Sequence, residues 1–261
     1  MAKYIESLML NWEQYYIDTE WVSPITTPWI YHNSDLWLIS LSSDWTNWVT
    51  IADKNLWATQ VRNDGDTLSE ANCGKYYQWW NNYGFPYTWS VTTSSTRVNA
   101  DTYWPWNYYS SSTFITRSSY PVRRDSWDNA NLWWWVTWTV EAMQWPCPSW
   151  YHIPSSTEFN NLYSLWVTIG AWSSSWWTNM NTYLKLPFAW WREVSNAATS
   201  WQWQRWNYFS ASRANVNFAF WLDFYANYIW LDGWIIRGNA SSIRPFANTP
   251  TQPDSTRTKL Y

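Results

Sequence analysis

Glycine is scarce in this chain, and several other common structural signals are missing as well. Only 6 of the 261 residues are glycine, against 31 tryptophans, whereas glycine normally supplies about 7% of a chain. The sequence has no run of about 18 apolar residues, so no membrane span is expected. Residues 1–7 have neither a basic segment nor an apolar core, so no signal peptide is expected. The net charge of −3 argues against nucleic acid as a partner.

Cysteine and histidine are too few for the common catalytic and metal-binding patterns. The two cysteines, Cys73 and Cys147, lack the spacing of metal ligands. They form either one disulfide, worth at most about 4 kcal/mol in the chain-entropy account, or a pair of buried free thiols. The two histidines, His32 and His152, give no basis for a Ser-His-Asp grouping. We expect His152 to make a structural hydrogen bond, and we expect no catalytic residue and no cofactor.

An early helix is predicted over residues 68–80. Thr67 and Glu70 have the spacing of a capping box, with Thr67 as the N-cap. The acidic residues Asp64, Asp66 and Glu70 are candidates for a calcium site, because Ca²⁺ binds carboxylate oxygens. Capping and compensation of the helix dipole explain the same residues more simply. The sequence therefore predicts a helix start here and no metal.

The best-defined element is a second helix that begins after Ser155. Ser155 and Glu158 form an S-x-x-E capping box, in which each side chain satisfies a backbone donor of the other. Pro154 precedes the cap, where a helix cannot yet exist. An apolar stripe at helical spacing follows, formed by Phe159, Leu162, Tyr163 and Trp166. We expect this stretch to anchor the fold and not to form an active site.

Many tryptophans stand where a turn normally has glycine. A bulky aromatic side chain has a steric cost at positive φ that glycine does not have. We therefore hypothesise that the gene uses the codon UGA for glycine and that this codon is translated as tryptophan in the sequence. Some tryptophans, Trp79 above all, are authentic. The alternative is a truly tryptophan-rich binding protein. The dipeptides that become turn signals with glycine are Asn11-Trp12, Asp44-Trp45, Asn47-Trp48, Ser126-Trp127 and Ser149-Trp150.

The remaining segments are assigned from composition and alternation. Residues 4–17 are predicted to form a hairpin, which is either an attachment element for a larger particle or an edge hairpin. Residues 18–34 are interpreted as a linker rich in proline and threonine. The segments without regular structure are expected to be a loop region with short strands at 81–131, a flexible loop at 195–206 and a disordered tail at 248–261. Strands are predicted at 36–42, 49–52 and 136–140.

Several motifs resemble the Fibrobacter succinogenes major paralogous domain. Residues 147–159 are similar to its signature, with Trp150 where the family has glycine, and residues 53–59 are similar to its opening segment. Residues 183–192 resemble one of its strands and the following turn. The resemblance covers residues 36–247 and implies an α+β, C-type-lectin-like fold. In such a fold two helices pack on twisted, mainly antiparallel strands, with long loops.

This family is placed beside the formylglycine-generating enzymes, which need a reactive cysteine pair near the C-terminal half. Cys73 and Cys147 fall elsewhere, so oxidase chemistry is only a distant alternative. The sugar-binding motif of calcium-dependent lectins is absent, so the likeness concerns the fold and not sugar binding.

Function is expected in the terminal stretch, residues 207–246. Lys, Glu, Gln and Met are absent from it, and these residues, with Trp, cannot be reached by changing adenines in an AAC or AAT codon. The stretch thus resembles the variable region of proteins diversified by a retroelement, which also use C-type-lectin-like folds. The resemblance implies a rigid scaffold that presents variable side chains to a ligand. Aromatic residues and asparagine suit this role, because they combine contact area with adaptable hydrogen bonds.

Alternation along the stretch predicts that Ala219, Leu222 and Phe224 point inward and that the intervening residues point outward. The expected function is non-enzymatic binding of an unknown protein or surface ligand, at a cell surface or on a virion such as a phage tail. The alternative is a surface adhesin or structural protein of fixed sequence. The predicted ligand-binding residues are Phe209, Ala211, Arg213, Ala214, Asn215, Val216, Asn217, Phe218, Phe220, Asp223, Tyr225, Ala226, Asn227, Tyr228 and Asp232.

Overall fold

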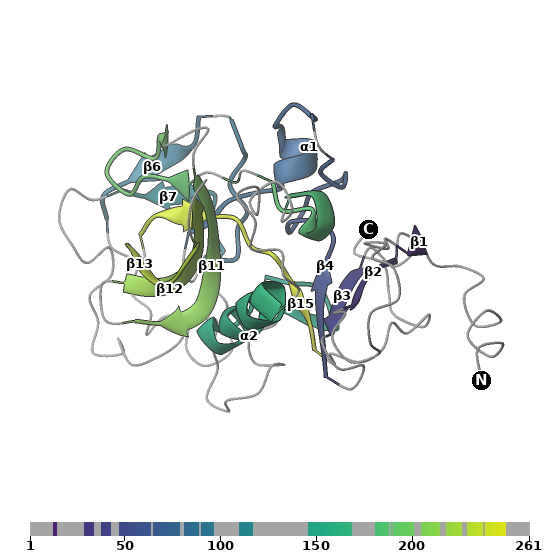
Figure 1. Ribbon diagram of the computed structural model, residues 1–261. Coiled ribbons are helices and arrows are strands. Elements are labelled where there is room, and N and C mark those ends of the chain that lie inside the picture. Colours follow the sequence, from purple (N-terminus) through teal and green to yellow (C-terminus); the bar gives the residue numbers. More distant parts are fainter. Residues whose placement is uncertain are drawn as a thin grey trace, which may run out of the picture.

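The computed structural model has a mixed α+β architecture in which several small sheets surround one longer helix (Figure 1). Predictions outside the described residues, such as the strand at 136–140, stay predictions. The structure describes residues 13–14, 29–33, 38–42, 47–63, 65–78, 81–88, 90–96, 110–116, 146–168, 181–187, 189, 191–200, 205–214, 218–225, 229–236 and 238–248.

The first sheet joins the beginning, the middle and the end of the described chain. Its strand order is β1-β2-β3-β4-β15-β8, and every pairing is antiparallel. Since β15 pairs with both β4 and β8, the last strand ties the early segment to the stretch before the central helix. The strands are β1 (Glu13–Gln14), β2 (Trp29–Asn33), β3 (Leu38–Ser42), β4 (Trp48–Ala52), β8 (Tyr151–His152) and β15 (Phe246–Ala247).

The predicted strands at 36–42 and 49–52 are confirmed over β3 and β4, but the linker interpretation of residues 18–34 is wrong over β2. All five residues of β2 pair with β3. Isoleucine and tyrosine within it favour a strand, which composition rich in proline and threonine had concealed. β1 pairs with β2, and the rest of the predicted hairpin lies outside the described residues.

The terminal stretch forms a three-stranded antiparallel sheet of β11 (Arg205–Arg213), β12 (Phe218–Tyr225) and β13 (Ile229–Ile236). Two further sheets are made of short strands. The four-stranded one has the order β10-β9-β14-β5, and the two-stranded one pairs β6 with β7 in parallel. Their bounds are β5 (Tyr77–Gln78), β6 (Thr92–Ser94), β7 (Thr113–Ile115), β9 (Trp191–Arg192), β10 (Thr199–Ser200) and β14 (Ala240–Ser241).

These strands confirm some loop predictions and correct others. Short strands do occur within residues 81–131, at β6 and β7. The flexible loop predicted at 195–206 is wrong at β10 and at the start of β11, because both segments pair with neighbouring strands. Residues 181–184 form a helical turn, so the strand expected from residue 183 begins only at β9.

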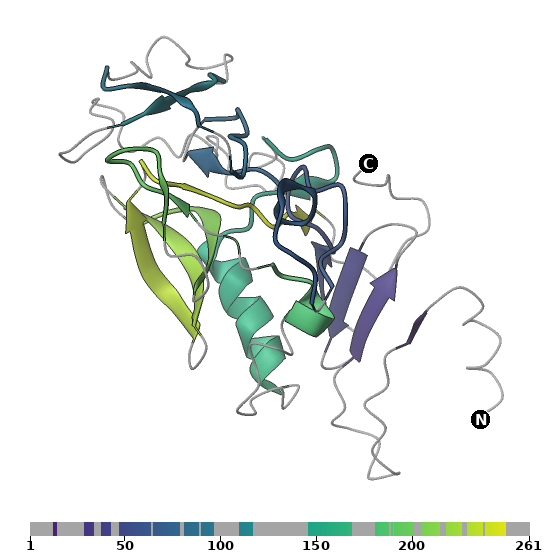
Figure 2. The same ribbon diagram turned by 90° about the horizontal axis from the view of Figure 1, so that it is seen from above.

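The central helix, α2 (Ser156–Thr168), begins where its capping box predicts. Both views place it between the three-stranded sheet and the first sheet (Figures 1 and 2). Of its predicted stripe, Phe159, Leu162 and Trp166 are buried in one cluster, whereas Tyr163 is only half-buried. Tyr183 and Val49 pack at the margin of this cluster. This cluster takes residues from all three elements, namely Ile39, Leu41 and Ile51 of the first sheet and Tyr208 and Leu222 of the three-stranded sheet.

The early helix is much shorter than predicted. α1 spans only Glu70–Cys73, and its N-cap is Ser69, not Thr67. The N–H of Ser69 donates to Oδ1 of Asn72 at 3.0 Å. Gly74 ends the helix with φ 71°, and Tyr77 then enters β5, where tertiary pairing overrides the helical pattern.

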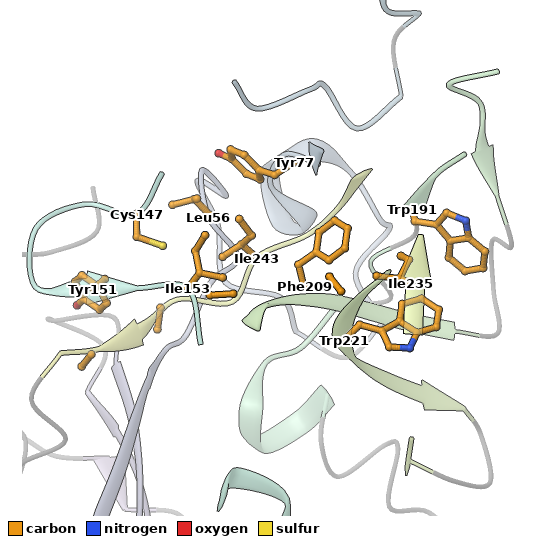
Figure 3. Packing of buried hydrophobic residues seen from close by; sticks show 14 of the residues in the cluster. Leu56, Tyr77, Cys147, Tyr151, Ile153, Trp191, Phe209, Trp221, Ile235 and Ile243 are labelled. Atoms are coloured by element: carbon orange, nitrogen blue, oxygen red, sulfur yellow. The ribbon is translucent and has the colours of Figure 1, made fainter. Parts of the chain in front are cut away.

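A larger core lies on the far side of the three-stranded sheet from α2 (Figure 3). Phe209, Trp221 and Ile235 bring the sheet into this core. The chain that precedes α2 adds Ile153, and residues 238–248, which we call the closing segment, add Ile243. The three-stranded sheet is therefore covered by packed side chains on both of its faces.

Candidate functional site

The three-stranded sheet holds most of the predicted ligand-binding residues, so the burial of its two faces decides which of them can meet a partner. Tyr208 pairs with Leu222 across the strands, and both pack against α2. The next pair, Phe209 with Trp221, points to the opposite face and enters the larger core. Successive residues of a strand alternate between faces, and here each face meets a core.

Three predicted binding residues are wrong as surface positions. Phe209, Ala211 and Asp223 are each 0% exposed, and we call them the buried trio. The prediction takes these residues to point outward, but Phe209 and Ala211 pack in the larger core. Ala219 and Leu222 are buried as predicted, while the side chain of Phe224 lies outside the description.

Three other predicted residues are half-buried at the β11–β12 end of the sheet. Ala214, Phe218 and Phe220, the half-buried trio, each keep part of their surface exposed. The N–H of Ala214 donates to the carbonyl oxygen of Phe218 at 3.0 Å, which closes the connection between the two strands. Among the predicted residues whose side chains the structure describes, the half-buried trio is the set that keeps part of its surface exposed.

The other predicted residues are placed only in part. Arg213, Tyr225 and Asp232 lie on β11, β12 and β13, but their side chains are outside the description. The remaining six fall in the two connections of the sheet, outside the described residues: Asn215, Val216, Asn217, Ala226, Asn227 and Tyr228.

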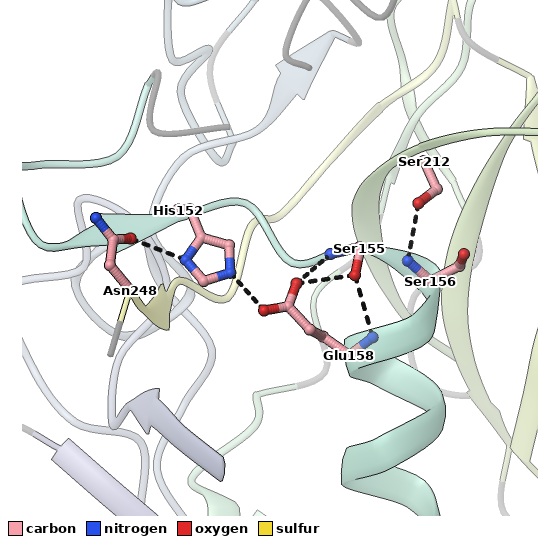
Figure 4. Close-up of polar contacts among 6 residues, drawn as sticks. All are labelled: His152, Ser155, Ser156, Glu158, Ser212 and Asn248. Atoms are coloured by element: carbon pink, nitrogen blue, oxygen red, sulfur yellow. Dashed lines mark hydrogen bonds and ion pairs between the residues drawn. The ribbon is translucent and has the colours of Figure 1, made fainter. Parts of the chain in front are cut away.

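A polar network fixes the start of α2 (Figure 4). Nε2 of His152 lies 2.7 Å from Oε1 of Glu158, and Nδ1 lies 2.9 Å from Oδ1 of Asn248. Oε2 of Glu158 accepts from the Ser155 N–H at 2.7 Å and from the Ser155 hydroxyl at 2.9 Å. The N–H of Glu158 donates back to Ser155 Oγ at 3.1 Å. The predicted capping box and the structural hydrogen bond of His152 are both confirmed. The disordered tail predicted from residue 248 is wrong at its first residue, because Asn248 belongs to this network.

The electrostatics of this network favour the ionised carboxylate. Burial on its own raises the pKa of Glu158, but the hydrogen bonds and charge of His152 and the two bonds from Ser155 outweigh it. The net result is a pKa below the ordinary value of 4.5. The network is therefore suited to holding a helix start in place.

The same helix start is bonded directly to the three-stranded sheet. The N–H of Ser156 donates to Oγ of Ser212 at 3.0 Å, and the N–H of Ala211 donates to the carbonyl oxygen of Pro154 at 2.8 Å. Two residues earlier on the same strand, the N–H of Phe209 donates to the carbonyl oxygen of Ser242 at 3.1 Å. Strand β11 is thus fixed to the helix and to the closing segment.

The sequence analysis did not identify Arg244, a buried residue that joins β4 to the segment after the helical turn at 181–184. The side chain is 1% exposed and donates to the carbonyl oxygens of Ala52 at 2.8 Å and Lys185 at 2.6 Å. Burial lowers the pKa of its guanidinium, against the opposing charges of Tyr208 and Asp53. No pattern around Arg244 pointed to this role, because its partners are backbone oxygens distant in the sequence.

The two cysteines are buried free thiols, which decides between the two alternatives. Burial is the largest influence on Cys73 and raises its pKa to about 11. Burial also raises the pKa of Cys147 well above its ordinary value. Both thiols therefore stay protonated at neutral pH, and thiolate is the nucleophilic form.

The acidic residues near α1 have structural partners. Oδ2 of Asp66 accepts the N–H of Asn63 at 2.7 Å, and Oε2 of Glu70 accepts the N–H of Tyr87 at 3.0 Å. Within the described ranges, no group of three or more His, Cys, Asp or Glu side chains is placed to hold a metal ion. Asp64 lies outside these ranges.

Among the described residues, every helix is too short or too polar to cross a membrane. In comparisons with known proteins, no family model matches the chain, no curated protein matches it and no solved structure matches it.

Proposed function

We propose that this chain is a non-enzymatic ligand-binding protein with a C-type-lectin-like fold, diversified at its C-terminal sheet by a retroelement. The observation that carries the proposal is the rigid mounting of that sheet. Helix α2 covers one face and the larger core covers the other. A surface held in this way keeps its shape when exposed side chains change, which lowers the entropic cost of binding.

The half-buried trio marks where the binding surface begins. Two of its members are phenylalanines, which offer large contact area with few rotatable bonds. Residues 215–217, two asparagines and a valine, lie between these two strands in the sequence, and we assign them to the same proposed surface. The proposed ligand is a protein or another surface component. The chain itself is proposed to act at a cell surface or on a virion.

Two displayed libraries test this proposal. The first randomises the half-buried trio, and the second randomises the buried trio as a matched control on the same strands. We expect most members of the first library to resist protease and most members of the second to be cleaved, because core positions do not tolerate random substitution. Binders to a chosen protein target should then emerge only from the first library. Equal protease sensitivity of the two libraries would contradict the proposed surface.

A further inference from the structure

Two tryptophans adopt backbone conformations that favour glycine. Trp57 has φ 65° and Trp150 has φ 73°. In this region of φ a Cβ atom crowds the neighbouring backbone, and bulky residues are rare there. Glycine has no Cβ and takes the same conformation without strain.

Each of these tryptophans is the third residue of a closed four-residue turn. The N–H of Ala58 donates to the carbonyl oxygen of Asn55 at 2.9 Å, and the N–H of Tyr151 donates to that of Pro148 at 3.2 Å. The second residue of each turn is not among those with positive φ. A positive φ confined to the third position is the pattern of a type II turn, which requires glycine or asparagine there.

Contacts outside the turns hold them in this shape. In the first turn, the N–H of Leu56 donates to the Ile243 carbonyl oxygen at 2.9 Å, and its own carbonyl oxygen accepts the N–H of Lys75 at 3.3 Å. In the second, the carbonyl oxygen of Trp150 accepts the N–H of Asn248 at 2.9 Å. A negative φ at Trp57 would move Leu56 and break its bonds to Ile243 and to Lys75, which follows α1. A negative φ at Trp150 would break the bond to Asn248.

Burial of the indole rings offsets little of this strain. Trp57 is 46% exposed and Trp150 is 58% exposed, whereas Trp166 is 1% exposed within α2. A tryptophan normally stabilises a fold through the apolar area that it buries. At positions 57 and 150 the backbone is that of a glycine turn, and much of the side chain lies in solvent.

Two further non-glycine residues among those described have positive φ, in a different setting. Lys185 follows the helical turn at 181–184, and the N–H of Ala197 donates to the carbonyl oxygen of Glu193 at 2.7 Å. Both are single left-handed residues that close a helical turn, a position that glycine prefers but other residues also take. They lack the type II pattern of the two tryptophans.

We propose that positions 57 and 150 are glycine in the protein made by its own cells, encoded by UGA codons that those cells read as glycine. The imbalance of 31 tryptophans against 6 glycines is an independent sign of the same substitution. With glycine at both positions, each turn forms without strain and keeps its bonds to the rest of the fold. This inference is independent of the proposed binding function.

Peptide mass spectrometry of the protein purified from its source cells tests the proposal directly. Trypsin releases Asn55–Arg62, and a glutamate-specific protease releases Ala142–Glu158, so each peptide covers one of the two positions. We expect glycine at 57 and 150, with UGA codons in the gene. Tryptophan at either position, or a UGG codon there, overturns the proposal for that position. Trp79 is the control, because it is expected to be tryptophan.

Recombinant variants test the backbone argument separately. Starting from the tryptophan-containing chain, Trp57→Gly and Trp150→Gly should each raise the urea midpoint above that of the matched alanine variants. Alanine removes the indole but keeps the Cβ, so it isolates the effect of φ. Trp166→Gly should lower the midpoint, because it empties a buried site in a helix. Alanine variants as stable as the glycine variants would overturn the argument, and the mass-spectrometric result stands even if no variant folds.

Discussion

The clearest stability prediction concerns Glu158 at the start of α2. Glu158→Ala removes the acceptor of three hydrogen bonds, two from Ser155 and one from His152. It leaves the backbone N–H of Ser155 and one ring nitrogen of His152 without their partner. The side chain of His152 is only 1% exposed, so water cannot readily replace the carboxylate.

The magnitude follows from these two losses. Loss of the cap interaction costs about 1 kcal/mol. A buried polar group left without a partner costs roughly 1–3 kcal/mol. We therefore expect Glu158→Ala to lower the free energy of unfolding by roughly 2–4 kcal/mol. Glu158→Gln keeps an oxygen acceptor but loses the charge, so its loss should be smaller.

Urea unfolding at pH 7, followed by far-ultraviolet circular dichroism, measures this loss. Thr157→Ala is the matched control, because Thr157 is exposed in the same turn of α2, and its effect should stay within about 0.5 kcal/mol. If Glu158→Ala is no more destabilising than Thr157→Ala, the network does not hold the helix start and the reasoning is refuted.

The same carboxylate makes a signed prediction for pH. Its folded pKa lies below the ordinary value of 4.5, so the folded state favours the ionised form. The resulting stabilisation is fully present above the ordinary value and is lost as the pH falls from 4.5 through the lower folded pKa. Glu158→Gln should therefore flatten the dependence of stability on pH in this acidic window, which urea titrations across the window would show. A dependence that Glu158→Gln leaves unchanged would assign the effect to other groups.

Three further predictions concern the framework of the fold. Gly74→Ala should destabilise by more than about 1 kcal/mol in urea unfolding, because φ is 71° and a Cβ would meet the Leu56 carbonyl oxygen; an unchanged midpoint would be contrary to this geometry. Arg244→Ala should destabilise by roughly 2–5 kcal/mol, since it removes the guanidinium donor of the Ala52 and Lys185 carbonyl oxygens and empties a buried site, and a loss below about 1 kcal/mol would argue against it. Native Cys73 and Cys147 should resist iodoacetamide at pH 7 and react after denaturation, as the raised pKa values require; rapid labelling of native protein would count against burial.

Local signals predicted local structure well. The capping box at Ser155 and the stripe ending at Trp166 fixed the start and buried face of α2, because both depend on residues within a few positions of one another. The same approach failed at Thr67 and for the helix expected over residues 68–80. There Gly74 ends the helix after four residues, and Tyr77 pairs with β14, a strand so distant in the sequence that no local window contains it.

The candidate site was predicted only in part for a related reason. Alternation identified Leu222 as inward but could not reveal that the opposite face of the sheet is also covered. Covering that face requires segments far apart in the sequence, such as Ile153 and Ile243. Alternation therefore predicts Phe209 and Asp223 at the surface, although both are buried.

The central claim is that a rigid sheet carries a surface whose sequence is diversified. Deep sequencing of the gene across a natural population, over the codons of residues 207–246, tests it most directly. The account predicts substitutions at the half-buried trio and in the connections at 215–217 and 226–228, with the buried trio unchanged. A sequence that is uniform over all of these codons, or equally variable in the buried trio, would contradict it.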